Sequence, residues 1–147
     1  MKKPEFVYVM YISTSSVRLW NALIDPKLTA KYWQHKNLSD WQKGSKWEHR
    51  RSDNDGTLDL LGKVIESAPP RRLVLSWAFP ADEAREEKHS RVTFEIEPYR
   101  DVVRLTVTHD HLEPDSKMLQ GIMEGWPKVL SSLKSLLEMG RPLPALW

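Results

Sequence analysis

The 147-residue sequence contains no cysteine. A chain without cysteine forms no disulfide, offers no thiolate nucleophile and holds no metal through sulfur. Its charges nearly cancel, because 22 lysine and arginine residues stand against 20 aspartate and glutamate residues and leave a net charge of +2. This balance argues against the strongly basic surface of a dedicated nucleic-acid-binding protein, so we expect no nucleic-acid partner.

Long apolar runs are missing as well. The apolar run at residues 6–12 is shorter than the core of a signal peptide and much shorter than a membrane span. We therefore expect no membrane partner and a cytoplasmic location. The length suits one domain that buries its own core, and we predict a single domain over residues 1–147.

The strongest periodic pattern lies between Ser116 and Met139, where apolar residues recur at steps of three and four. This spacing predicts one long amphipathic helix. Asp115 or Ser116 is expected to cap its start, and Pro127 is expected to kink it because proline forfeits a backbone hydrogen bond. The apolar face of such a helix needs a large apolar surface to cover it.

The preceding chain supplies mainly strands and short helices. Two short helices, separated by Asp25-Pro26, are predicted at residues 16–24 and 27–32, the first with Val17 on its buried face. Residues 34–44 show no clear period. Strands are predicted at residues 6–12, 45–52, 57–67, 72–79, 89–98 and 102–111, and Gly62 suggests a bulge or bend.

Sequential strands joined by short turns form an antiparallel meander, which can curl around the last helix. The sequence therefore predicts an α+β fold in which a curved antiparallel sheet wraps around the long C-terminal helix, with two short helices after the first strand.

This order of elements, together with several local motifs, resembles one superfamily over nearly the whole chain. It is similar to the helix-grip fold of the START-like (SRPBCC) superfamily, and within it to homologues of the activator of the heat-shock chaperone ATPase, the AHSA-type domains. The motifs that carry the resemblance are residues 20–23, Tyr32-Trp33, residues 61–66, residues 69–77, residues 105–109, and Gly125-Trp126 with Leu130, Leu133 and Leu137.

The resemblance implies a cavity between the sheet and the long helix that binds a small hydrophobic molecule, with no cofactor. Members of the superfamily also include co-chaperone-like domains and polyketide cyclases. A protein-interaction module and a cyclase- or hydrolase-type enzyme are therefore the alternative functions. The chaperone activators resemble this chain in one domain only, so we rank a chaperone contact below ligand binding.

Aromatic and flexible apolar residues are the predicted lining of this cavity, with two histidines orienting the ligand. A filled core is the competing interpretation of the same pattern. The candidate ligand-binding residues are Trp33, Trp47, His49, Trp77, His109, Met118, Ile122 and Trp126.

Polar candidates for chemistry are few. His49, His109 and His111 are conceivable as a three-histidine metal site, but no acidic ligand stands at suitable spacing, so we predict no metal. His49 could act as a general base beside a bound carbonyl group. Asp59 and Glu48 would approach the interior if the strand register shifted by one residue.

Three outcomes separate these functions. A ligand-binding protein needs an open cavity, an interaction module needs a filled core with an exposed patch, and an enzyme needs a buried polar group with a perturbed pKa inside the cavity. The tail with Leu143, Leu146 and Trp147 is expected to pack on its own domain or on a second copy, which would give a homodimer.

Overall fold

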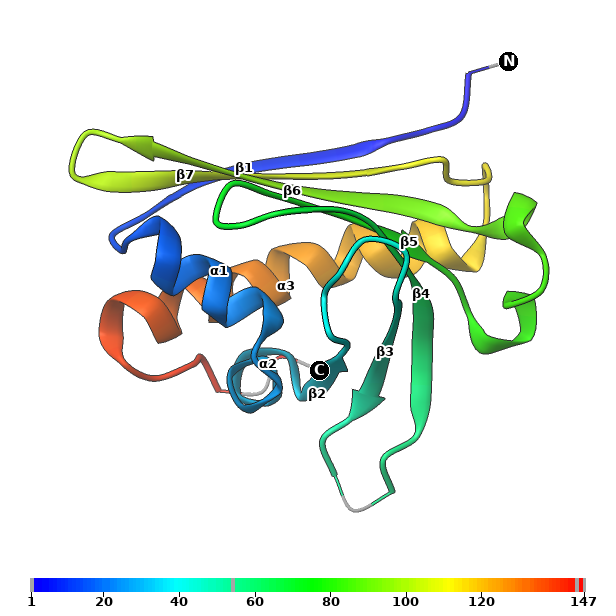
Figure 1. The fold of residues 1–147 in the computed structure, drawn as a ribbon, viewed down its shortest axis with the longest axis horizontal. Helices are drawn as coiled ribbons and strands as arrows, with labels where there is room; N and C mark the ends of the chain where they lie inside the picture. Colours follow the sequence, from blue (N-terminus) through cyan, green and yellow to red (C-terminus); the bar gives the residue numbers. More distant parts are fainter. Residues whose placement is uncertain (1, 54, 145, 147) are drawn as a thin grey trace.

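The computed structural model describes residues 2–53, 55–144 and 146. Asn54 of the predicted turn at residues 53–56 and Trp147 of the tail lie outside the described residues. The elements, drawn in Figure 1, are β1 (Phe6–Ile12), α1 (Ser16–Ile24), α2 (Pro26–Trp33), β2 (His35–Leu38), β3 (Lys46–Arg51), β4 (Leu58–Ala68), β5 (Arg72–Trp77), the short 3-10 helices η1 (Pro80–Asp82) and η2 (Glu86–Lys88), β6 (Ser90–Tyr99), β7 (Val102–Asp110) and α3 (Lys117–Met139).

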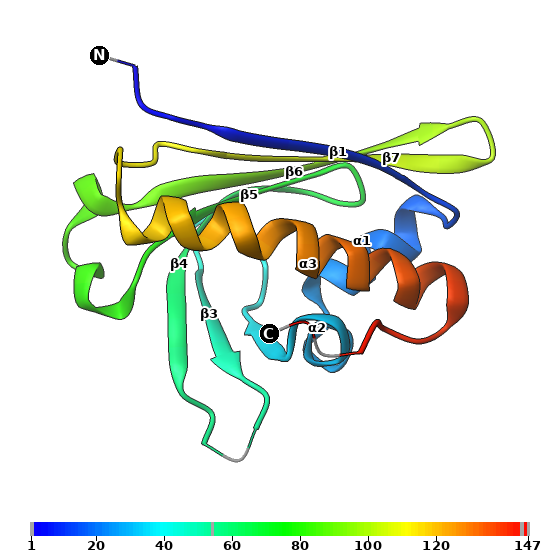
Figure 2. The same ribbon diagram turned by 180° about the vertical axis from the view of Figure 1, so that it is seen from behind.

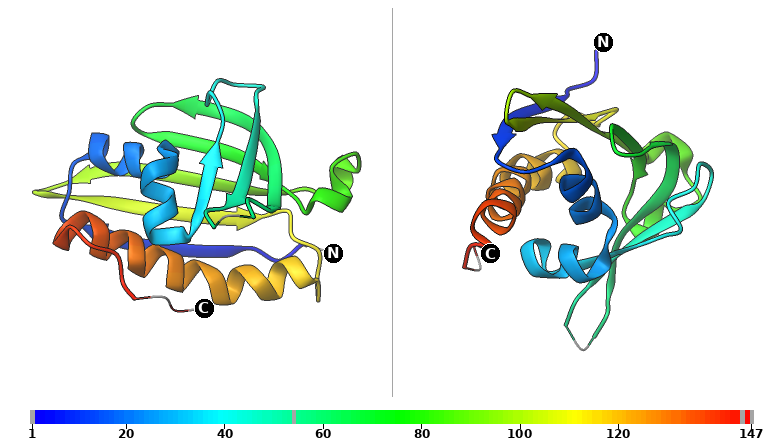
Figure 3. Two further views of the ribbon diagram at one scale, coloured as in Figure 1. Left: turned by 90° about the horizontal axis from the view of Figure 1, so that it is seen from below. Right: turned by 60° about the vertical axis from the view of Figure 1, so that its left-hand side comes forward.

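Seven strands form one antiparallel sheet in the order β1-β7-β6-β5-β4-β3-β2. From β2 to β7 the strands that neighbour in the sheet also follow one another in the chain, as a meander requires. β1 pairs with β7 and forms one edge. Figure 3 shows the sheet curled around α3, with α1 and α2 beside the helix. The predicted α+β helix-grip fold is confirmed.

The long helix α3 crosses the concave side of this sheet (Figure 2). The Ser116 side chain caps it by accepting a hydrogen bond from the Leu119 amide, and Gly140 ends it in the left-handed conformation. Pro127 lies inside the helix, and a bend there stays a prediction. The buried stripe of α3 consists of Ile122, Trp126, Val129, Leu130, Ser132, Leu133, Leu136 and Leu137. Among the described residues, none of the helices has the length and hydrophobicity to cross a membrane.

Two sequence-based expectations are wrong in detail. Residues 34–44 contain a strand, β2, which pairs with β3. Its alternation is hidden in the sequence because the inward residue is the polar Asn37, which is buried; its backbone N–H donates to Thr29 Oγ1 and its side-chain Oδ1 lies 2.5 Å from His49 Nδ1. Val17 is 58% exposed, and the buried face of α1 instead carries Leu19, Trp20, Ala22 and Leu23.

Gly62 lies in β4 at a point where the backbone and a side chain of neighbouring strands come very close. β4 pairs with β3 from Leu58 to Lys63 and with β5 from Val64 to Ala68, with a register shift between Val64 and Glu66. A Cβ atom on Gly62 would lie 1.9 Å from the Ser76 carbonyl oxygen and 2.7 Å from Nε1 of Trp47. That indole nitrogen donates a hydrogen bond to the same carbonyl at 2.8 Å. Glycine is therefore required because two backbones and an indole meet here.

Replacing Gly62 with alanine should lower the free energy of unfolding by about 3 kcal/mol, because the new methyl group would clash with backbone atoms, which cannot move without distorting the sheet. Gly121→Ala is the matched control, since a Cβ there has no atom within 4 Å and alanine favours a helix by up to about 1 kcal/mol. Urea unfolding followed by circular dichroism measures both. Equal stability of the two variants would contradict the close approach at Gly62.

Candidate functional site

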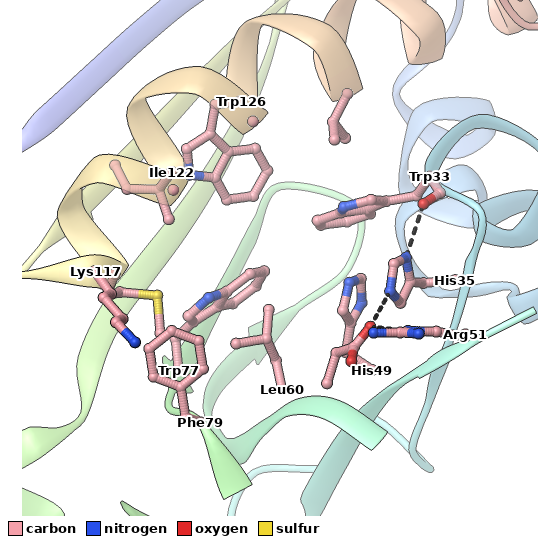
Figure 4. A pocket seen from close by; sticks show the side chains of 15 residues that line it. Trp33, His35, His49, Arg51, Leu60, Trp77, Phe79, Lys117, Ile122 and Trp126 are labelled. Atoms are coloured by element: carbon pink, nitrogen blue, oxygen red, sulfur yellow. Dashed lines mark hydrogen bonds and ion pairs between the residues drawn. The ribbon is translucent and has the colours of Figure 1, made fainter. Parts of the chain in front are cut away.

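A cavity of about 410 Å³ opens between α3 and the half of the sheet formed by β2 to β5 (Figure 4). One wall is the inward face of α3, and the opposite wall comes from the end of α2, from β2 to β5 and from the loop after β5. The lining residues are Trp33, His35, His49, Arg51, Asp59, Leu60, Trp77, Phe79, Lys117, Met118, Gly121, Ile122, Gly125, Trp126 and Val129.

Two of the α3 positions that line the cavity are glycines, the exposed Gly121 and the half-buried Gly125. Gly121 and Gly125 stand one helical turn apart on the face that also carries Ile122 and Trp126. A Cβ atom at either glycine would meet no atom within 4 Å. The cavity therefore exists partly because side chains are missing where the helix faces the sheet.

Three tryptophans from three different elements form the apolar side of the cavity. The ring centroids of Trp33 and Trp77 lie 6.0 Å apart, those of Trp33 and Trp126 5.4 Å apart, and those of Trp77 and Trp126 5.6 Å apart. Each is at least nine-tenths buried. Such contacts between aromatic rings add to the stabilisation from buried area, so this side is a preformed, rigid surface.

The polar side of the cavity is built around His35. Its Nδ1 lies 2.9 Å from the Trp33 carbonyl oxygen and its Nε2 lies 2.8 Å from Oδ2 of Asp59. The Trp33 carbonyl and the Asp59 carboxylate are both hydrogen-bond acceptors, so each of them faces one nitrogen of the His35 ring. Partial burial opposes ionisation of Asp59, yet hydrogen bonds from Arg51 and His35 hold its pKa below the usual value.

His49 stacks on His35, with the ring centroids 4.0 Å apart and the planes within 5° of parallel. Its Nδ1 lies 2.5 Å from Oδ1 of Asn37, so Nδ1 carries the proton. Burial, followed by the charge on His35, holds the pKa of His49 well below its usual value. His49 is therefore a neutral imidazole whose Nε2 keeps its lone pair.

His109 belongs to a separate hydrogen-bonded chain. The indole Nε1 of Trp126 donates to His109 Nδ1 at 3.1 Å, because an indole nitrogen is only a donor. His109 Nε2 donates to Ser90 Oγ at 2.7 Å, and Ser90 Oγ donates to the Trp77 carbonyl at 3.2 Å. Burial lowers the pKa of His109 to about 3, so the ring is neutral and all of its polar atoms are satisfied.

Most of the residues predicted for the site meet at the cavity. Trp33, His49, Trp77, Met118, Ile122 and Trp126 line it. The other two, Trp47 and His109, do not line the cavity. Trp47 is fully buried and donates to the Ser76 carbonyl, and the His109 ring points toward Ser90, with which it shares a hydrogen bond. That the six residues bind a ligand stays a prediction.

Sequence reasoning missed several lining residues. His35 lay in a stretch without a period, and Gly121 and Gly125 carried no signal beyond their spacing. Asp59 lines the cavity edge, whereas Glu48 instead pairs with Arg50. His111 is exposed and stands apart from the other two histidines of the conceivable metal site. Within the described part of the chain, no group of three or more histidine or acidic side chains could hold a metal ion.

Comparison with known proteins gives one family and many similar structures. The family model described as activator of Hsp90 ATPase homolog 1-like protein matches residues 13–138. A Mesorhizobium loti protein of known structure is 25% identical, with 91% of this chain and 96% of that chain covered and a TM-score of 0.75. A search of curated protein sequences gave no significant match.

Two further structures show the same fold at lower identity. The Aha1 dimer from Colwellia psychrerythraea is 20% identical, with 93% of this chain and 98% of that chain covered and a TM-score of 0.76. An HSP90 activator from Plasmodium falciparum is 22% identical, with 94% and 97% covered and a TM-score of 0.73.

The buried neutral histidines make stability depend on pH. An unfolded chain protonates histidine near its ordinary pKa of about 6.5, whereas folded His109 takes up a proton only at about 3. Stability is therefore full above pH 6.5 and falls as the pH drops toward 3. Between pH 7 and 5, His109 alone should remove about 2 kcal/mol from the free energy of unfolding.

The test compares urea unfolding at pH 7 and pH 5 for the wild type, His109→Gln and His111→Gln. In His109→Gln, the difference in the free energy of unfolding between pH 7 and pH 5 should be about 2 kcal/mol smaller than in the wild type. The second should keep it, because His111 is exposed and the substitution removes no buried imidazole. An unchanged pH dependence in His109→Gln would mean that His109 is not held neutral.

Proposed function

The chain belongs to the family of activator of Hsp90 ATPase homolog 1-like proteins, and on that premise we propose that it binds a small hydrophobic molecule in the cavity between α3 and the curled sheet. The observation that carries this proposal is the cavity itself. Its volume of about 410 Å³ falls in the range of small-molecule sites, and its lining is mainly apolar and aromatic with a few convergent polar groups.

The packing around the cavity supports a ligand site over a filled core. The three tryptophans pack against one another through ring contacts. No additional side chain from α3 is required to cover them. Gly121 and Gly125 keep the opposite wall open, although alanine or leucine would favour the helix and fill the space. Burying an apolar ligand there would remove apolar surface from water, which is the main driving force for such binding.

The enzyme alternative has one feature in its favour, since His49 is a buried group with a lowered pKa at the cavity. The direction of the shift, however, makes the imidazole a weak base. Its Nδ1 is oriented by the neutral amide of Asn37 and not by a carboxylate that would strengthen it. We therefore rank turnover behind binding, with His49→Ala as the variant that would abolish catalysis.

Ligand binding should appear as a rise in the unfolding midpoint, read by tryptophan fluorescence against flavonoids, fatty acids and polyketides. A ligand at about a hundred times its dissociation constant adds roughly 2.7 kcal/mol, which for a chain of this size is a shift of about 5–10 °C. Gly125→Leu should remove this shift, because the new side chain enters the open space, while the unliganded variant stays at least as stable as the wild type.

The matched control is Glu124→Leu, which adds the same side chain at the neighbouring exposed position of α3. It should keep the ligand-induced shift. Two results would count against the proposal: no compound of the panel shifts the wild type, or Gly125→Leu responds to a ligand as the wild type does.

The second candidate function is contact with an Hsp90-type chaperone. The family description and the Plasmodium falciparum structure favour it, together with an exposed apolar strip on β1. Val7, Val9 and Tyr11 are 52%, 50% and 44% exposed, and Tyr99 lies against Tyr11 with the ring centroids 5.1 Å apart. The Colwellia psychrerythraea structure is a dimer, and a homodimer of this chain stays a prediction.

If β1 is the contact surface, Val9→Glu should weaken binding to purified Hsp90 by about tenfold or more, measured by calorimetry, because it places a charge in the apolar strip. Val17→Glu introduces the same charge at an exposed valine of α1 and should leave the affinity unchanged. Absence of measurable binding by the wild type would remove this candidate.

A further inference from the structure

Trp77, a residue that lines the cavity, carries a buried hydrogen-bond donor without a partner. Of the buried side-chain polar atoms in the described residues, only Thr14 Oγ1 and Trp77 Nε1 have none. Two other buried indoles are paired, since Trp47 donates to the Ser76 carbonyl and Trp126 donates to His109. Trp77 is 3% exposed, and its N–H is unfavourable for as long as it stays unpaired.

The same cavity contains a free acceptor. His49 uses Nδ1 to donate to Asn37. Its Nε2 has no hydrogen bond to any described residue and, unlike Trp77 Nε1, is not one of the fully buried unpaired atoms. Because the ring is neutral, this nitrogen carries a lone pair. His49 is also a lining residue, and its ring centroid lies 6.0 Å from that of Trp77. A donor and an acceptor therefore stand on the same side of the cavity.

From this pairing we infer the chemical class of the ligand: a flat aromatic molecule that carries a carbonyl group and a hydroxyl group. The carbonyl oxygen accepts from Trp77 Nε1, and the hydroxyl donates to His49 Nε2. The aromatic body packs against Trp33 and Trp126. This inference rests on the proposed binding function and specifies its ligand.

Figure 4 shows the indole of Trp77 between Trp126 on one side and Leu60 and Phe79 on the other. Its nitrogen is covered by protein atoms, so the ligand displaces a neighbouring side chain to reach it. Met118 and Phe79 are suited to this movement. Both line the cavity, Met118 is only partly buried and unbranched, and Phe79 is 38% exposed.

The ionic groups at the cavity edge favour an uncharged ligand. Asp59 accepts hydrogen bonds from both His35 and Arg51, at 2.8 Å and 2.9 Å. The charges of Arg51 and Asp59 compensate each other, so this ion pair leaves no ionic partner for a charge on the ligand in the interior. Lys117 lines the cavity from the first turn of α3 and is exposed, so an anionic group would remain at the mouth.

Four compounds with one ring system test the inference: naphthalene, 2-acetylnaphthalene, 2-naphthol and a set of hydroxy-acetylnaphthalene isomers. Calorimetry or fluorescence titration of the wild type gives each dissociation constant. Each polar group should tighten binding by about tenfold over naphthalene, and the best isomer with both groups by about a hundredfold.

The outcomes separate the two claims. If none of the compounds binds, the proposed ligand-binding function fails. If naphthalene binds and the polar groups add nothing, the cavity remains a ligand site but the inference about hydroxy-carbonyl ligands is overturned. A gain from only one group overturns the assignment of the other.

Two variants assign the groups. Trp77→Phe removes the free indole N–H and should abolish the advantage of 2-acetylnaphthalene over naphthalene while keeping that of 2-naphthol. Trp41→Phe is the control, because it removes a buried indole that does not line the cavity, so the advantage of the acetyl group should persist. The same ratio in both variants would contradict the role of Trp77.

Nuclear magnetic resonance of the wild type provides a readout that needs no variant to fold. The indole N–H proton of Trp77 should shift downfield with acetyl compounds and not with naphthalene. The Nε2 nitrogen of His49 should shift with hydroxyl compounds alone. Equal perturbation of both resonances by naphthalene would indicate general ring proximity and overturn the assigned hydrogen bonds.

Discussion

The part of the sheet that wraps around α3 contains one contact that leaves no room for a side chain, in which Gly62, the Ser76 carbonyl and the Trp47 indole meet. On one side of this contact, β6 packs directly against α3, with the Phe94 and Trp126 ring centroids 5.9 Å apart. On the other side, β3 and β4 turn away from the helix and contribute His49 and Leu60 to the cavity wall. The contact therefore lies between a half of the sheet that packs on the helix and a half that lines the cavity.

The features that the sequence predicts well are those set by neighbouring residues. The three- and four-residue spacing from Leu119 to Leu137 gives α3 and its buried stripe, and Ser116 and Asp25 cap helices through their own side chains. Alternation in β7 places Val103, Leu105 and Val107 inward. Because these signals are local, the fold class and the family resemblance follow from them, and both agree with the structure and the family match.

The site is less predictable because its polar groups depend on residues distant in the sequence. His35 is oriented by Asp59 from β4 and by the Trp33 carbonyl at the end of α2, so its position has no pattern of its own. Trp47 and Trp77 both alternate inward on their strands, yet only Trp77 reaches the cavity, because the Ser76 carbonyl holds the other indole aside. Gly121 and Gly125 matter through the side chains they lack, and their effect requires knowing what stands opposite.

The chain from Trp126 through His109 and Ser90 to the Trp77 carbonyl also restricts how this protein can diverge. Each link supplies a donor to the next acceptor in a region closed to water, so an apolar replacement at one link leaves a polar atom stranded at another. Drift at positions 90, 109 and 126 is therefore not independent. Homologues that change one of them are expected to carry a compensating change at a second. The hydrogen bonds should therefore make these three positions covary.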